Sequence, residues 1–373
     1  MWRIWKEEVY KIASQKILWL GLLLLLLFVT MRLFTERNHY SVTIDGQVYR
    51  GQEAIDQDRA LTAKYAGILT EDKVRQIYDD FGFYNYDEAK DISTGNFCSE
   101  YITRKMTNYN QIDPENAETV RFLEGDAWEQ NAAPLLKGNV QFDYTYGWND
   151  LKETYSFLMV MALFVIFIIG ISPVYSEEYT LKTADILLTT QRGKKNGIWM
   201  KVTAALFLAT AVYCVFSAYL WLIYRIVYGT QGLDASPVLI GIGMTEGFCP
   251  ADIRGFFRLS FALGLAGVLL LTSITLAVSA LCRNAFFTVV ISLAMFFVPY
   301  VWMNVLATML SPLFSSDLTR TVSHFMVSMP FYLPVNWGFG FSAEQLGIHV
   351  GIAAGAGMIS AVLGYWKFRN YQG

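Results

Sequence analysis

The sequence predicts an α-helical polytopic membrane protein with six transmembrane helices, an N-terminal interfacial helix and a small α+β extracytoplasmic domain between spans 1 and 2. Two observations favour this class. Long apolar stretches recur along 373 residues that are 54% hydrophobic with a mean hydropathy of +0.33, and about 20 apolar residues suffice to cross the hydrocarbon layer. Between the first two stretches lies an acidic block, residues 36–153, with 22 acidic and 12 basic residues. A soluble domain rarely shows this pattern.

The first 16 residues have the pattern of an amphipathic helix. Trp2, Trp5, Val9 and Ile12 recur at helical spacing, and charged residues occupy the other side. Such a helix lies in the membrane interface, with its tryptophans at headgroup depth. We therefore predict an interfacial helix over residues 1–16; the alternative is a solvated basic tail.

Six apolar stretches have the length of a membrane span. They are residues 17–34, 154–175, 202–228, 255–281, 285–310 and 347–367. We predict that the first is a retained span and not a signal peptide, the main alternative, because no small-residue cleavage pattern follows it. Lysines and arginines precede it, which places the N-terminus in the cytoplasm. An even number of spans then makes both termini cytoplasmic, with residues 35–153, 229–254 and 311–346 outside.

The 35–153 segment is long enough for a small folded domain. Asp45-Gly46 lies between two short apolar runs, which is the strongest local signal for a β-hairpin. Helical patterns follow over residues 53–66 and 71–81. These elements predict a mixed α+β domain that rests on the membrane surface.

Two further elements are predicted in the second half of that domain. Asp113-Pro114 has the form of an N-cap followed by proline, which predicts a helix that continues to about Leu123. Aromatic residues alternate from Phe142 to Trp148. Alternation indicates a strand, or an aromatic foot that returns to the membrane surface.

The titratable residues predict no catalytic site and no metal site. Carboxylates are scattered, and His39 is the only histidine in the domain, which is too little for a metal centre. The four cysteines, Cys98, Cys214, Cys249 and Cys282, lack the CxxC spacing of a zinc site. Cys98 and Cys249 are both predicted outside and are a candidate disulfide pair. Their expected separation argues against the bond.

Glycines at regular spacing mark predicted helix-packing faces. Gly347, Gly351 and Gly355 repeat every four residues in the last span, and Gly264 and Gly267 lie in the fourth. Small residues at such spacing let helices approach closely. The alternative is ordinary intramembrane glycine, which is frequent in spans.

The membrane part lacks the residues of a self-powered transporter. The sequence contains no GxxxxGK[ST], so it does not bind ATP through a P-loop. None of the spans contains an acidic residue, although a proton- or ion-driven carrier usually has one. The driving energy must therefore enter through residues 176–201, a charged loop between spans 2 and 3. Its five basic and three acidic residues place it in the cytoplasm.

This loop and its flanking spans resemble the membrane subunit of the ABC-2 class of ATP-binding-cassette exporters. The shared features are an acidic residue that closes the second span, a short helix, a Leu-Leu pair, a small-residue turn, a basic residue and a lysine that enters the third span. In this sequence they are Glu178, Leu187-Leu188, Thr189-Thr190, Arg192 and Lys201. The family's usual Gly-Thr is Lys182-Thr183 here, and its usual Thr-Pro is Thr190-Gln191. The large domain between the first two spans resembles a bacterial subset.

The resemblance implies a coupling helix that docks on a separate ATPase. The docking residues would be Glu178, Leu181, Lys182, Asp185, Leu187, Leu188, Arg192, Lys194 and Lys201. The implied partners are two ABC ATPase subunits and a second permease, identical or homologous, in a bacterial plasma membrane. This chain would hold no cofactor of its own, since ATP and magnesium would bind to the ATPase. Spans 2 and 5 would line the pathway, and residues 311–346 would include re-entrant helices.

We therefore expect a permease subunit that moves an amphipathic or hydrophobic cargo outward, such as a peptide, a lipid-linked molecule or a drug. The scarcity of fixed charges in the spans favours such a cargo. The expected surroundings are membrane lipid; neither an enzymatic activity of its own nor a nucleic-acid partner is expected. The alternative is a receptor or sensor whose outer domain signals to a cytoplasmic partner through the loop between spans 2 and 3.

Overall fold

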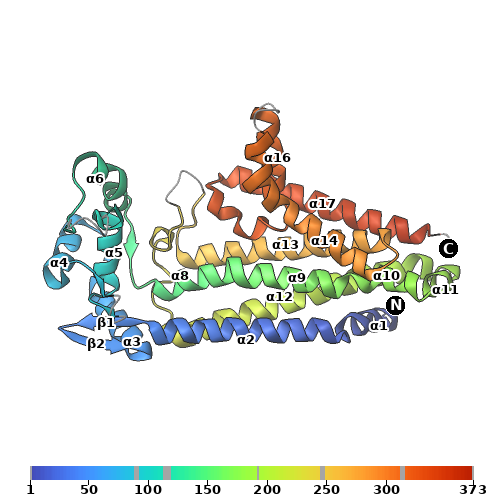
Figure 1. Ribbon diagram of the computed structural model, residues 1–373, viewed down its shortest axis with the longest axis horizontal. Coiled ribbons are helices and arrows are strands. Elements are labelled where there is room, and N and C mark those ends of the chain that lie inside the picture. The colour runs from blue at the N-terminus through green and yellow to red at the C-terminus, as the bar shows by residue number, and fades with distance from the viewer. Residues whose placement is uncertain are drawn as a thin grey trace.

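The computed structural model describes residues 2–87, 92–111, 119–190, 193–243, 248–310 and 316–371. Six helices in the described part are long and apolar enough to cross a membrane, which confirms the predicted number. Figure 1 shows them packed along the long axis of the molecule, with the domain between spans 1 and 2 at one end and the two chain ends at the other. An even number of spans requires this arrangement.

The bundle is built from long helices and a few short ones. The first half holds α1 (Trp2–Ala13), α2 (Lys16–His39), α8 (Tyr146–Glu153), η3 (Thr154–Met159), α9 (Val160–Ile171), α10 (Pro173–Thr180), α11 (Thr183–Thr189) and η4 (Gly193–Gly197). The second half holds α12 (Ile198–Tyr228), η5 (Pro237–Ile240), α13 (Ile253–Leu281), α14 (Ala285–Val301), η6 (Trp302–Leu306), α15 (Ala307–Leu310), α16 (Ser316–Val327), η7 (Leu333–Phe339) and α17 (Ala343–Arg369). From α8 to α10 the second span is one helical run, Tyr146–Thr180.

Local sequence signals fix several helix ends. The side chains of Asp252, Asn284 and Ser342 each accept a hydrogen bond from a backbone N–H in the first turn of α13, α14 and α17. Ser342 and Gln345 form a reciprocal capping box, which satisfies two otherwise unpaired donors. Pro299 lies inside α14 and has no N–H to donate. Soon after it, the helix widens into the π-helical turn η6.

Helix α13 is the most buried span and packs on α9, α12, α14 and α17. Gly264 and Gly267 lie against large side chains of two neighbouring helices. A Cβ at Gly264 would collide with the hydroxyl of Tyr213, and one at Gly267 would lie 3.0 Å from a ring carbon of Phe164. These two glycines therefore do what small residues do at helix crossings.

Helix α17 approaches α13 through other glycines than those singled out in the sequence. A Cβ at Gly364 would lie 3.2 Å from the α13 backbone, and Gly357 also borders α13. In contrast, a Cβ at Gly347, Gly351 or Gly355 would meet no atom of another described residue within 4 Å. Their face is turned away from the rest of this chain.

The domain between spans 1 and 2 begins with the predicted hairpin. Strands β1 (Ser41–Ile44) and β2 (Gln47–Arg50) pair antiparallel, and Asp45 and Gly46 have φ values of 52° and 76°, as a two-residue hairpin turn requires. The remaining elements are α3 (Gly51–Thr62), η1 (Ala63–Tyr65), β3 (Gly67–Ile68), α4 (Glu71–Phe81), β4 (Tyr86–Asp87), β5 (Ile92–Ser93), α5 (Phe97–Met106), η2 (Tyr109–Gln111), α6 (Gly125–Asn131), α7 (Ala133–Lys137) and β6 (Gln141–Phe142). β3 pairs with β6 and β4 with β5.

Two elements of the domain differ from the prediction. Residues 112–118, which include Asp113 and Pro114, lie outside the described residues. The described residues 119–123 are not helical, and Phe122 forms an isolated bridge with Thr107. Of the alternating aromatic residues, only Phe142 lies in a strand, and Trp148 belongs to α8. The helix of the second span continues into the domain. Trp148 is therefore buried as a residue of a helix and not of a strand.

A cluster of four residues binds the domain end of the bundle together, and we call it the domain-end cluster. Arg32 of α2 forms a 2.7 Å ion pair with Asp150 of α8 and donates to the hydroxyl of Thr154. Tyr224 of α12 donates to the other oxygen of Asp150 at 2.7 Å. Spans 1, 2 and 3 are thereby joined where the domain begins.

The domain also caps the third span. The Gln52 amide of α3 donates to the Val227 carbonyl at 2.9 Å, and Arg59 donates to the Tyr228 carbonyl at 3.2 Å. The last carbonyls of a helix have no partner inside the helix, and a cation suits their negative end. The domain is therefore fixed to the bundle and is not a freely tethered module.

Candidate functional site

The loop between spans 2 and 3 turns sharply at the bundle end that holds both termini. Lys182 separates α10 from α11 and has left-handed backbone angles, with φ 56° and ψ 23°. That conformation costs a residue with a side chain about 1–2 kcal/mol. Helix α11 then returns through η4 to the start of α12 (Figure 1).

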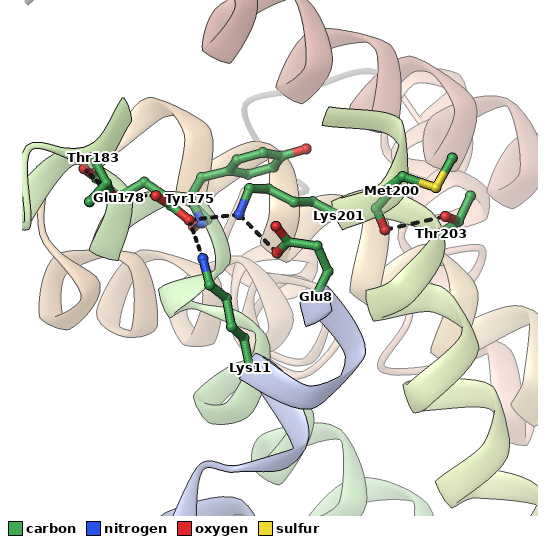
Figure 2. Close-up of polar contacts among 9 residues, drawn as sticks. Glu8, Lys11, Tyr175, Glu178, Thr183, Met200, Lys201 and Thr203 are labelled. Carbon is green, nitrogen blue, oxygen red and sulfur yellow. Dashed lines mark hydrogen bonds and ion pairs between the residues drawn. The ribbon is translucent and has the colours of Figure 1, made fainter. Parts of the chain in front are cut away.

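Four charged residues meet beneath this corner, and we call them the termini-end cluster. Lys201 of α12 donates to Glu178 of α10 at 2.7 Å and to Glu8 of α1 at 2.9 Å, and Lys11 of α1 donates to Glu178 at 2.9 Å. Figure 2 shows the Lys201 ammonium between the two carboxylates. The hydroxyl of Thr183, the first residue of α11, donates to the second oxygen of Glu178.

Three of the four charged residues in this cluster are buried, and Lys11 is exposed. Lys201 is 1% exposed and Glu178 6%, so each would be costly without its partners. Burial acts to lower the pKa of Lys11, but the hydrogen bond to Glu178 and the charges of Glu8 and Glu178 outweigh it and raise that pKa. The cluster therefore ties α1, α10, α11 and α12 into one unit.

The short helix α11 divides its residues between this unit and the surface. Ala184 is buried, and Leu187 and Leu188 are half-buried against the core. Leu181 and Ile186 are 63% and 71% exposed. Exposed apolar side chains in a charged segment are typical of an interaction surface.

Apart from the half-buried Leu187 and Leu188, the predicted docking residues fall into three groups. Leu181, Lys182 and Asp185 are exposed on the corner and on α11, whereas Glu178 and Lys201 are buried beneath it. Arg192 lies outside the described residues, and Lys194 lies in η4. Docking by these residues stays a prediction, and for the two buried ones it can only be indirect.

A groove of about 770 Å³ opens between α1 and the α10–α11 corner. Lys11 and Ile12 line one wall, and Glu177, Leu181 and Ile186 line the other. The groove brings exposed apolar and charged groups of α11 next to the N-terminal helix. A partner that binds α11 would therefore also meet α1.

The cysteines and carboxylates do not form another site in the described part of the chain. Cys98 is a free thiol buried in the domain core, and Cys249 is a free, exposed thiol. Nowhere among the described residues do three or more potential ligands come together in a geometry that could hold a metal ion.

The comparisons with known proteins now decide the family. The model of a family described as ABC-2 family transporter protein matches residues 2–368. This chain belongs to the ABC-2 transporter family. No curated protein and no solved structure gives a match. The chain is therefore a multi-pass ABC-2 permease, and its family implies pairing with an ABC ATPase subunit.

The backbone at Lys182 explains why the family usually has glycine at this position. The position of Lys182 is usually glycine in the family that this loop resembles, and here the backbone is left-handed, which glycine adopts without strain. Three candidate residues were not predicted from the sequence. Glu8 and Lys11 were missed because their partners lie more than 160 positions away. Ile186 was missed because the adjacent Leu-Leu pair has the same apolar character.

Proposed function

We propose that this ABC-2 permease is the membrane subunit of an ATP-driven exporter, and that a separate ATPase drives it through α11. The observation that carries the proposal is the exposed surface of the α10–α11 corner and of α11. Leu181 and Ile186 expose apolar surface beside the charges of Lys182 and Asp185. That combination suits a partner groove with an apolar floor and a polar rim.

The termini-end cluster makes α11 a suitable lever. Thr183 begins α11 and is bonded to Glu178, which shares Lys201 with Glu8. A push on α11 is therefore passed to spans 2 and 3 and to α1 together. Rocking of packed helices as rigid bodies is a general way to alternate access across a membrane.

The unpartnered surfaces of the bundle support a second permease and an amphipathic cargo. Only 28%, 22% and 17% of the apolar windows of α2, the 285–309 span and α17 are buried within this chain. These faces are free for lipid and for a second copy or homologue, between which a pathway can form. We propose that such an assembly carries two ATPase subunits, and that its cargo is hydrophobic or amphipathic: a peptide, a lipid-linked molecule or a drug.

We further propose a bacterial plasma membrane location, with α1 and α11 in the cytoplasm and the domain outside. A cysteine-free variant provides the test. Ile186→Cys should react with a membrane-impermeant maleimide only after the membrane is opened, and Ile68→Cys of the domain should react in intact cells. The reverse pattern would refute the orientation.

The docking proposal is tested by charge insertion on α11. Leu181→Asp/Ile186→Asp should abolish co-purification of an ABC ATPase subunit with the tagged permease, because each aspartate would have to be desolvated in the interface. Val48→Asp/Ile68→Asp is the matched control, since it changes two exposed apolar residues of the domain. If neither the native chain nor the control retains an ATPase, a sensor role takes the place of export. Retention by the α11 variant refutes docking at this face.

A further inference from the structure

A second cleft, of about 730 Å³, lies near the domain end of the bundle. The domain-side halves of α12 and α13 form its walls, and Tyr155 of η3 closes it. Its lining is largely apolar and aromatic. Trp221 and Phe257 meet across it with ring centroids 5.7 Å apart, and Phe261 stacks on Tyr213 with ring centroids 5.3 Å apart.

Among the described residues, the lining contains three arginines and no carboxylate. Arg225 lies in the last turn of α12, and Arg254 and Arg258 lie one turn apart at the start of α13. Only Arg254 has an acidic partner, Asp234 at 2.8 Å, and that aspartate is highly exposed. Arg225 and Arg258 have neither a hydrogen bond nor an ion pair with any residue of the described chain.

Two alternative explanations account poorly for these arginines. An arginine near a span end can extend to the interface for solvation alone, but this would not gather three around one cleft. Topology does not call for them either, because basic residues are favoured on the cytoplasmic side and the proposed orientation puts this end outside. The combination that remains is three exposed arginines beside an aromatic groove, at the ends of two membrane-spanning helices.

We propose that this cleft binds a glycerophospholipid with a net anionic headgroup. Its phosphate would lie between Arg225 and Arg258, whose planar guanidinium groups suit phosphate oxygens in a bidentate way. Its acyl chain would lie on Trp221, Phe257 and Phe261. The site is separate from the α11 groove and does not depend on the ATPase.

The test measures lipid binding to the full-length permease in detergent by native mass spectrometry. Dioleoyl phosphatidylglycerol should bind at least about tenfold more tightly than dioleoyl phosphatidylcholine, and Arg225→Gln/Arg258→Gln should remove that preference, because two charge-assisted contacts are lost. Arg75→Gln/Arg320→Gln removes the same charge from exposed sites outside the cleft and should bind like the native chain. Equal binding of the two lipids by the native chain, or an unchanged preference in the cleft variant, would overturn the proposal.

A second arm separates a lipid from a free anion. Ala218 is an exposed residue of the cleft lining, so Ala218→Trp fills the groove without a change of charge or core packing. It should weaken phosphatidylglycerol binding about fivefold or more, with an unchanged unfolding midpoint, because the acyl chain loses its space. Millimolar glycerol phosphate should not displace the lipid. Displacement, or full binding by Ala218→Trp, would show that only an anion site exists and would refute the lipid assignment.

Discussion

The two polar clusters hold opposite ends of the same helix, α12, in different ways. The termini-end cluster places a fully buried lysine, Lys201, between carboxylates of two other helices. The domain-end cluster uses Arg32, whose side chain is 25% exposed, to reach Asp150 and Thr154. The termini-end cluster joins α1, α10, α11 and α12, and three of its four charged residues are buried, whereas the domain-end cluster joins spans 1, 2 and 3 through a partly exposed arginine.

The two settings of α12 indicate which end of the bundle can move. An ammonium is a compact charge on a flexible stem, so Lys201 can follow small shifts of its carboxylates, whereas the planar fork of an arginine is directional. We therefore interpret the domain end of α12 as the fixed end and the end beside α11 as the one that moves. Because burial makes partner loss expensive, the moving end should also be the more sensitive to mutation.

The largest effect is expected for Lys201→Met. It leaves Glu178 and Glu8 buried with only Lys11, which costs about 3–5 kcal/mol of unfolding free energy. Chemical unfolding of the purified chain in detergent measures the loss. The double variant Glu178→Met/Lys201→Met should recover part of the lost unfolding free energy, since Glu8 and Lys11 can then pair. Lys16→Met, at an exposed lysine, is the control. A loss of unfolding free energy below about 1 kcal/mol in Lys201→Met would show that water solvates the charges of the cluster.

A smaller effect is expected at the other end. Arg32→Met should cost about 1–2 kcal/mol, because water still reaches this site and Tyr224 continues to donate to Asp150. The same unfolding assay compares it directly with Lys201→Met. Equal or reversed costs for the two variants would remove the distinction between a fixed and a moving end.

The domain offers a buried acid in a different setting. Asp58 accepts hydrogen bonds from Tyr40 and from the Phe97 N–H, but burial outweighs them and raises its pKa to about 7. Because the pKa of Asp58 is higher in the folded protein than in the unfolded chain, folding favours the protonated carboxyl. The free energy of unfolding should therefore fall by about 1 kcal/mol for each unit by which the pH rises from roughly 4 to 7. Unfolding of Asp58→Asn across this range should show a flatter profile; a profile as steep as the native one would exclude Asp58 as its source.

The smallest effect is expected at the α10–α11 corner. Lys182→Gly should stabilise the chain by about 0.5–1 kcal/mol, since the left-handed strain disappears while glycine adds entropy to the unfolded state. Thr180→Gly, one helical position before the corner, is the control and should destabilise. Hydrogen exchange of α11 amides would locate the change, and an unaltered or faster exchange in Lys182→Gly would argue against strain at this position.

Local signals carried much of the fold. The six apolar runs and the Asp-Gly turn depend on neighbouring residues only, so they were readable in the sequence. The extension of the second span to Tyr146 could not be predicted, because the tertiary packing of Trp148 outweighed the alternating pattern of the local sequence. The packing glycines of α17 also escaped, because which face meets α13 depends on the whole bundle.

The candidate site was predictable only in part. The family pattern pointed to Glu178 and Lys201, but nothing local shows that they are buried and paired. Their contacts with Glu8 and Lys11 join segments that are far apart in the chain. The arginine cleft likewise depends on the alignment of two helix ends, which sequence spacing does not fix.

The most direct measurement is site-specific crosslinking from α11. In a cysteine-free permease purified with its ATPase, a photoreactive maleimide attached at Ile186→Cys should form a covalent adduct with the ATPase, with a yield that changes when ATP is added. The same reagent at Ile68→Cys, on the domain, should give none. Equal labelling from both positions, or an adduct from neither in an intact complex, would contradict the account of α11 as the driven lever.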